Sequence, residues 1–111
     1  MSDCVFCKIV GGNIPSAKVY EDDYVYAFND IDPQAPVHIV LVPKKHYDNI
    51  KDLDNDKIKV SIFNAIQKIA FDQKLDAGFR VICNTGEQGG QTVEHLHFHI
   101  LSGRNLQWPP G

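Results

Sequence analysis

The chain has 111 residues, of which 43% are hydrophobic and 23% are charged, and 11 Lys and Arg residues against 14 Asp and Glu residues give a formal net charge of -3. This size and composition predict one compact domain over residues 1–111, and they exclude a strongly basic surface of the kind that binds a nucleic acid backbone. The longest uninterrupted apolar run, residues 39–42, is far shorter than the roughly 20 residues that a membrane-spanning helix needs.

The N-terminal segment has no basic stretch followed by a long apolar stretch, so it does not resemble a secretory signal. We therefore expect a cytoplasmic protein, with the nucleus as a second location. Three cysteines are an odd number. In a reducing compartment the pair Cys4-x-x-Cys7 indicates metal or redox chemistry rather than a disulfide framework.

Short elements separated by turn residues make up the first part of the chain. Residues 4–10 predict a short helix, which two glycines and a proline then end. Residues 17–20 and 24–28 carry aromatic and β-branched side chains on either side of an acidic turn, as expected of an antiparallel hairpin. Residues 37–42 are apolar at both parities, which predicts a strand that is covered on both faces and that directs His38 toward the core.

One long helix is predicted in the second part of the chain. Apolar residues repeat at helical spacing after Asp54, the expected N-cap, and the repeat ends near Lys74. Val60 and Phe71 lie off the apolar stripe, so they are either a dimer contact or ordinary exposed residues. Residues 79–83 then predict a new strand.

Residues 95–101 alternate histidine with apolar residues. As a strand, this segment places three imidazoles on one face: His95, His97 and His99. Such a group suits two chemistries, a catalytic Zn²⁺ with an open water position or an imidazole nucleophile assisted by an imidazole acid. The preceding residues 89–92 offer N–H groups and a hydroxyl to an anion, which favours phosphoryl chemistry.

Residues 95–101 match the His-φ-His-φ-His-φ-φ signature of the histidine triad (HIT) family of nucleotide hydrolases and transferases. Further matches make the chain resemble the HINT-like branch, the small nucleoside phosphoramidases: Phe6-Cys7-Lys8-Ile9, Ile14-Pro15, residues 30–36, Pro43-Lys44-Lys45-His46, Gly89-Gly90-Gln91 and Trp108-Pro109-Pro110-Gly111. The resemblance implies an α+β HIT-like fold with an antiparallel sheet of about five strands, one long helix, a short N-terminal helix and a two-sheet homodimer.

The resemblance also implies roles for four histidines. His97 would attack the α-phosphorus of a nucleoside 5′-phosphoramidate to form a nucleotidyl-histidine intermediate, which water would then hydrolyse. His99 would be the general acid on the leaving-group side. His38 and His95 would fix the orientation and tautomer of His97, because a nucleophilic ring nitrogen must be unprotonated while its partner nitrogen carries the hydrogen.

A purine nucleotide pocket is implied in the same way. The wall against the base would consist of Phe6, Ile9, Phe28 and Ile31. The ribose would contact Asp30. The phosphate would contact Asn84, Gly90, Gln91 and Thr92, together with His97 and His99. Without the resemblance, the apolar members would be assigned to the core, the aspartate to a turn cap and the others to a polar loop.

Cys4, Cys7, His46 and His95 resemble the ligand positions of the zinc-binding HINT-like proteins. Zn²⁺ would be structural, holding the N-terminal helix against the sheet, and His95 would be shared between metal and triad. Two reduced, partly buried thiols are the competing interpretation. Cys83 is expected in the core.

The expected function is hydrolysis of the P–N bond of adenosine or guanosine 5′-phosphoramidates, with no metal in the chemical step. The ligands would be such phosphoramidates or AMP and GMP, and no nucleic acid or membrane partner is expected. One alternative is a nucleotide-binding scaffold or regulatory module with incidental hydrolysis. The other is a metal-dependent hydrolase.

Overall fold

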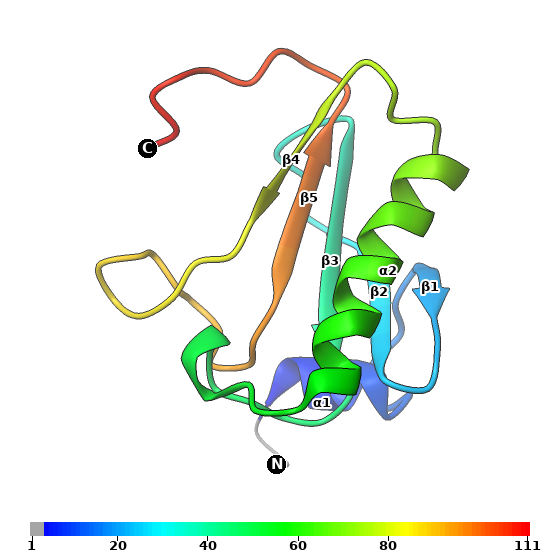
Figure 1. Cartoon of the computed structure of the whole chain (residues 1–111), viewed down its shortest axis with the longest axis vertical. Coiled ribbons are helices and arrows are strands. Elements are labelled where there is room, and N and C mark those ends of the chain that lie inside the picture. Colours follow the sequence, from blue (N-terminus) through cyan, green and yellow to red (C-terminus); the bar gives the residue numbers. More distant parts are fainter. Residues whose placement is uncertain (1–3) are drawn as a thin grey trace.

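The computed structural model, which describes residues 4–111, confirms an α+β fold with an antiparallel sheet of five strands (Figure 1). The elements are, in chain order, α1 (Val5–Val10), β1 (Lys18–Glu21), β2 (Val25–Asn29), β3 (Val37–Pro43), the 3-10 helix η1 (Ile50–Asp52), α2 (Asp56–Asp72), β4 (Phe79–Ile82) and β5 (Phe98–Ser102). The strands lie in the order β1-β2-β3-β5-β4, so β3 is central.

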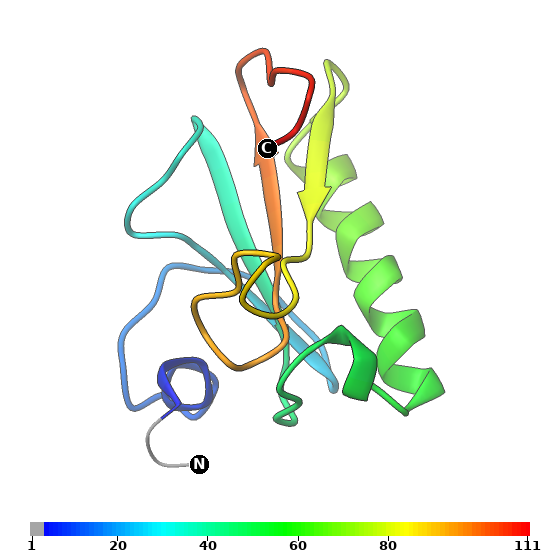
Figure 2. The same cartoon turned by 90° about the vertical axis from the view of Figure 1, so that its left-hand side faces the viewer.

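The central strand β3 sends alternate side chains into two apolar clusters. Ile39 and Leu41 are buried in a core that also contains the apolar stripe of α2. Val40 and Val42 are buried on the opposite face, where side chains of α1 pack against them. Figure 2 shows α2 along one side of the sheet and α1 on the other. The prediction that this strand is covered on both faces is therefore correct, and His38, on the same parity as Val40, lies on the α1 side.

The ends of α2 differ from the prediction. The N-cap is Asn55 rather than Asp54, because the Asn55 side chain accepts a hydrogen bond from the backbone N–H of Ile58 at 3.0 Å. The helix ends at Asp72 rather than near Lys74, which has a left-handed φ of 57° and so cannot continue a right-handed helix.

The last strand begins later than the alternation of residues 95–101 predicts. β5 starts at Phe98, so His95 and His97 precede the strand and only His99 belongs to it. The backbone N–H of Leu96 donates to the carbonyl of Tyr47 at 2.7 Å instead of to a neighbouring strand. On the other side, β4 ends at Ile82, which pairs with His99. The segment nevertheless keeps the predicted alternation, since Leu96 and Ile100 are buried in the core beneath α2.

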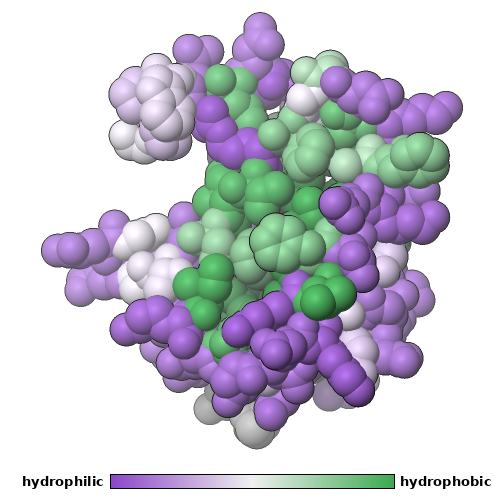
Figure 3. Space-filling view, viewed as in Figure 1, coloured by the Kyte–Doolittle hydropathy of each residue, from purple (hydrophilic) through white to green (hydrophobic). Residues whose placement is uncertain are grey.

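Large apolar side chains remain exposed on α2 and on β4, which is an edge strand. They are Val60, Phe63, Phe71, Phe79 and Val81. Figure 3 shows an apolar band down the middle of the face seen in Figure 1. Val60 and Phe71 are exposed as expected, and Phe63, which was not predicted, is exposed beside them on the same helix. Within residues 4–111, none of the helices is long and apolar enough to cross a membrane.

Candidate active site

A cavity of about 320 Å³ lies between α1, the end of β2 and the histidine segment. Its size is at the lower end of the range of small-molecule sites. The predicted nucleotide residues that line it are Phe6, Ile9, Phe28, Asp30, Ile31, Thr92, His97 and His99. Residues far apart in the sequence therefore meet at one concave, mostly apolar surface that carries a few polar groups.

Three predicted contact residues do not line this cavity: Asn84, Gly90 and Gln91. The N–H groups of Gly90 and Gln91 donate within their own loop, to the carbonyls of Glu87 and Gly86 at 3.0 Å each. Their contact with a nucleotide stays a prediction. The cavity also has walls that the sequence analysis did not assign to it, namely Val5, Ile14, Pro15, Ser16, Asn29, Val40 and Val93. Several of these are chain neighbours of the predicted residues, which is the one signal that could have found them.

His97 is buried, and its two ring nitrogens have different surroundings. Nδ1 lies 2.7 Å from the backbone carbonyl oxygen of His95, which can only accept, so Nδ1 carries the hydrogen. In the neutral ring Nε2 is therefore unprotonated and free to act as a nucleophile. The ring packs edge-on against Phe6, with centroids 5.0 Å apart. The contact of His95 with His97 is thus made by its backbone carbonyl and not by its imidazole.

His38 contacts His99 instead of the predicted His97. The backbone N–H of Gln34 donates to Nδ1 of His38 at 3.0 Å, so a neutral His38 carries its hydrogen on Nε2. That nitrogen lies 2.9 Å from Nδ1 of His99. Nδ1 of His99 must then accept, which leaves the hydrogen of His99 on Nε2. The result is a ring N–H donor on a side chain that lines the cavity.

Burial, with the neighbouring imidazoles of His97 and His38 as smaller causes, lowers the pKa of His99 from an ordinary 6.5 to about 4. The ring is therefore neutral near pH 7 in the ligand-free protein, where it is a hydrogen-bond donor but not an imidazolium acid. An anion bound beside it would favour the charged form and raise the pKa again.

Asp30 has two functions in the structure. One carboxylate oxygen accepts from the backbone N–H of Asp32 at 2.8 Å, which caps the turn after β2. The other lies 3.4 Å from Nε2 of His38. Because the residue also lines the cavity, the turn-capping interpretation and the predicted ligand contact are compatible.

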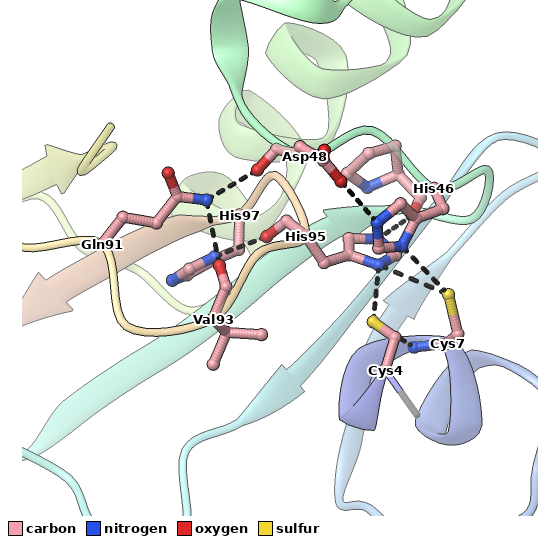
Figure 4. A network of polar contacts seen from close by, with 9 residues as sticks. Cys4, Cys7, His46, Asp48, Gln91, Val93, His95 and His97 are labelled. Atoms are coloured by element: carbon pink, nitrogen blue, oxygen red, sulfur yellow. Dashed lines mark hydrogen bonds and ion pairs between the residues drawn. The ribbon is translucent and has the colours of Figure 1, made fainter. Parts of the chain in front are cut away.

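The four predicted metal ligands come together at the N-terminus of α1 (Figure 4). The Sγ atom of Cys4 is 3.2 Å from Nδ1 of His95, and the Sγ atom of Cys7 is 3.3 Å from Nδ1 of His46 and 3.6 Å from Nδ1 of His95. Zn–S and Zn–N bonds of about 2.3 and 2.0 Å make the S···N edge of a tetrahedral site about 3.5 Å long. The two thiols and two imidazoles therefore fit Zn²⁺ in both donor type and spacing.

Hydrogen bonds at Nε2 of His95 and His46 orient the two rings so that their Nδ1 atoms face the sulfur atoms of Cys4 and Cys7. Nε2 of His95 donates to the carbonyl of Pro43 at 2.9 Å, and Nε2 of His46 lies 3.0 Å from the carboxylate of Asp48. Each bond places the ring hydrogen on Nε2 and leaves Nδ1 free to bind a metal. Burial, as the main cause, also lowers the pKa of His95, which keeps its ring neutral as a metal ligand requires.

The side chain of Gln91 joins the metal cluster to the wall of the cavity (Figure 4). Its Nε2 donates to the carbonyls of Asp48 at 2.6 Å and Val93 at 2.9 Å, and its Oε1 accepts from the N–H of Gly86 at 2.9 Å. Asp48 contacts the metal ligand His46, whereas Val93 lines the cavity. Gln91 therefore holds the loop in shape, a role that the sequence analysis did not assign to it.

The chain is similar in sequence and in fold to several known proteins. The family model described as HIT domain matches residues 11–106. A 14 kDa zinc-binding protein of Brassica juncea is 44% identical over 114 residues, which cover 98% of this chain and 100% of the relative. A HIT family hydrolase from Legionella pneumophila superimposes with a TM-score of 0.88 at 43% identity, covering 98% of this chain and 100% of that chain. A histidine triad nucleotide-binding protein from Candida albicans superimposes with a TM-score of 0.86 at 33% identity, covering 96% and 83%.

Proposed function

The chain belongs to the HIT domain family, and from this premise we propose that it hydrolyses the P–N bond of adenosine or guanosine 5′-phosphoramidates through a covalent nucleotidyl-histidine intermediate. The relatives are a hydrolase and a nucleotide-binding protein by name, which supports the general class of activity. The observation that carries the specific proposal is His97, whose Nδ1 is held by the carbonyl of His95 so that Nε2 is left as a free nucleophile in the cavity.

The first step is attack of Nε2 of His97 on the α-phosphorus. A new P–N bond to His97 forms while the P–N bond to the amine breaks, and the departing nitrogen must gain a proton to leave as a neutral amine. His99 supplies that proton. The ring is neutral in the empty site, and the anionic phosphoryl group favours its protonation on binding. In the protonated ring both nitrogens carry hydrogen: the one on Nδ1 faces Nε2 of His38, which then accepts it, and the one on Nε2 is the proton donated to the leaving group.

The second step is hydrolysis of the nucleotidyl-histidine. His99, neutral after it has given up its proton, accepts a proton from water as the water oxygen attacks phosphorus. The P–N bond to His97 breaks, and the nucleoside monophosphate is released. Both histidines then have the protonation states with which they entered the first step, so the cycle balances without a metal.

The apolar walls of the cavity suit a purine. Phe6 and Phe28 pack against each other with ring centroids 5.8 Å apart, and both line the cavity with Ile9. Aromatic faces stack on a base without reading its edges closely, which accommodates adenine and guanine alike. Asp30, whose side chain is partly exposed at the cavity, is the group proposed to accept from the ribose hydroxyls.

A structural Zn²⁺ at Cys4, Cys7, His46 and His95 is part of the proposal. When bound, it would crosslink α1 to the segments that carry the histidines and would take no part in the reaction. The spacing of the four donor atoms and the zinc-binding relative from Brassica juncea support this assignment. The metal-dependent hydrolase is disfavoured because the imidazole of His95 faces the thiols, so the three triad rings do not converge on one point.

We further propose a homodimer in the cytoplasm. The exposed edge of β4 and the apolar residues beside it would otherwise leave unpaired backbone groups and large apolar side chains in water. A second copy of the chain would cover both. Sedimentation of the purified protein tests this assembly.

Rapid-quench mass spectrometry of the intact protein tests the catalytic proposal. Wild type mixed with an adenosine phosphoramidate should gain a transient nucleotidyl adduct, and His97→Ala should gain none. AMP binding by His97→Ala, measured by calorimetry, checks that the cavity survives the substitution. Turnover that persists in the variant without any adduct would remove His97 as the nucleophile. Binding of AMP without any turnover in wild type would favour the scaffold instead.

A further inference from the structure

A serine lies among the apolar walls at the end of the cavity that is proposed to hold the base. Ser16 lines the cavity together with Phe6 and Phe28. Its Oγ is 2.7 Å from the phenol oxygen of Tyr26, a residue outside the cavity lining. We propose that Ser16 is a specificity-determining residue that donates a hydrogen bond to the Watson–Crick edge of a purine, and that Tyr26 is its positioning residue. The ligand in this inference, a purine nucleotide, rests on the proposed function.

The order of the strands places Ser16 far from the reacting groups. Ser16 leads into the edge strand β1, and Tyr26 is on the neighbouring strand β2. The central strand β3 separates both from β5, which carries His99 (Figure 1). With neighbouring strands about 4.8 Å apart, β1 lies about 14 Å from β5. In a nucleotide whose phosphate lies at His97, the Watson–Crick edge is the part of the base farthest from the phosphorus, so this edge faces Ser16.

The register of the sheet provides a floor between these two ends of the cavity. Phe28 pairs with Val40, and Val40 pairs with His99, so the three side chains form a row across the α1 face of the sheet. Tyr26 lies two residues before Phe28 on the same face, and their ring centroids are 6.1 Å apart. A base stacked on Phe28 therefore extends toward the hydroxyl groups of Tyr26 and Ser16.

The phenol of Tyr26 leaves the hydroxyl hydrogen of Ser16 available to a ligand. A phenol is more acidic than the hydroxyl of serine and is the stronger donor, so Tyr26 donates to Oγ of Ser16. Among residues 4–111, this oxygen has no second protein partner at hydrogen-bond distance. Ser16 therefore keeps one O–H to donate. Adenine offers N1 and guanine offers O6 as an acceptor on the Watson–Crick edge, so the hydroxyl suits both purines.

Tyr20 provides a matched control for Tyr26. Its phenol also donates within the β1–β2 hairpin, to the carboxylate of Asp22 at 3.1 Å. Its ring packs against the core cluster that contains the apolar stripe of α2, whereas Tyr26 packs against the cluster on the α1 side. Tyr20→Phe therefore removes a phenol hydrogen bond of the same hairpin without changing the partner of Ser16.

Calorimetry with three 5′-monophosphates tests the inference. Two are AMP and GMP, and the third is benzimidazole riboside 5′-monophosphate, whose base has the shape of a purine but no hydrogen-bonding atom on its six-membered ring. For Ser16→Ala we expect the affinity for AMP and GMP to fall about 3- to 10-fold, which corresponds to one neutral hydrogen bond. The affinity for the benzimidazole nucleotide should not change, because its base makes no such bond.

Three more variants separate the hydroxyl from the packing. Tyr26→Phe keeps the ring against Phe28 and should lower the affinity for AMP and GMP about threefold, again without an effect on the benzimidazole nucleotide. Ser16→Thr keeps a hydroxyl and should retain most of the purine affinity. Tyr20→Phe should match wild type with all three nucleotides.

Two results in Ser16→Ala would overturn the inference. Equal losses for all three nucleotides would show that Ser16 only shapes the wall, and unchanged purine affinity would show that its hydroxyl does not reach the base. Turnover of an adenosine phosphoramidate by wild type, measured in parallel, tests the proposed function separately. If turnover is absent but the affinities follow the expected pattern, the proposed function fails and Ser16 stands as a base contact. If wild type binds none of the three nucleotides, both fail.

Discussion

Replacement of Gln91 by alanine should destabilise the protein and weaken nucleotide binding together. The side chain makes three hydrogen bonds, to Gly86, Asp48 and Val93, at 2.9, 2.6 and 2.9 Å. At a net contribution of about 1 kcal/mol per bond, their sum is about 3 kcal/mol, and water can replace part of this at the exposed groups. We therefore expect Gln91→Ala to lower the free energy of unfolding by about 2 kcal/mol.

Urea denaturation of Gln91→Ala measures this loss, with Gln88→Ala as the control because Gln88 is an exposed glutamine of the same loop. AMP affinity, measured by calorimetry on the folded variants, should fall for Gln91→Ala because Thr92 and Val93 of the cavity wall follow it directly. If both variants match wild type in stability and in affinity, the loop does not depend on the Gln91 amide and the reasoning is wrong.

Three further results are expected. Asp48→Ala should weaken Zn²⁺ binding about 10- to 100-fold in a chelator competition, with Asp52→Ala as an unaffected control, because the carboxylate of Asp48 orients His46. The pKa of His99 is about 4 in the folded protein against an ordinary 6.5, so the unfolded chain binds more protons between these values. Stability should therefore fall by up to about 3 kcal/mol as the pH decreases from 6.5 to 4, and His99→Gln should lack this contribution in urea titrations. Asn55→Ala should cost about 1 kcal/mol and Asp54→Ala less, by thermal unfolding, since only Asn55 caps α2.

Local pattern was sufficient for the elements and for the faces of their side chains. The alternation in residues 95–101 correctly places Leu96 and Ile100 in the core, because a period of two holds in any extended chain. The alternation could not show that strand pairing in β5 starts at Phe98. Pairing depends on where β4 ends and on the carbonyl of Tyr47, to which the N–H of Leu96 donates instead of to a neighbouring strand. The N-cap was similarly ambiguous, since Asp54 and Asn55 both have suitable side chains and are adjacent.

The partners of polar side chains were harder to predict than the list of site residues. The pairing of His38 with His99 joins two strands that lie side by side only in the folded sheet. The resemblance to a family brings a residue such as Gln91 to attention as part of a motif, but whether its amide meets a ligand or its own loop depends on where the backbone carbonyls of Asp48 and Val93 lie. Directions of hydrogen bonds are properties of the three-dimensional structure, so they could not be read from spacing.

His95 serves two sites through two different parts of the residue. Its imidazole belongs to the metal cluster, whereas its backbone carbonyl orients His97. Every amino acid at this position would supply that carbonyl. The metal site and the nucleophile can therefore diverge separately under mutation: a descendant of this chain could lose the thiols and the imidazole at position 95 and still inherit an oriented nucleophile.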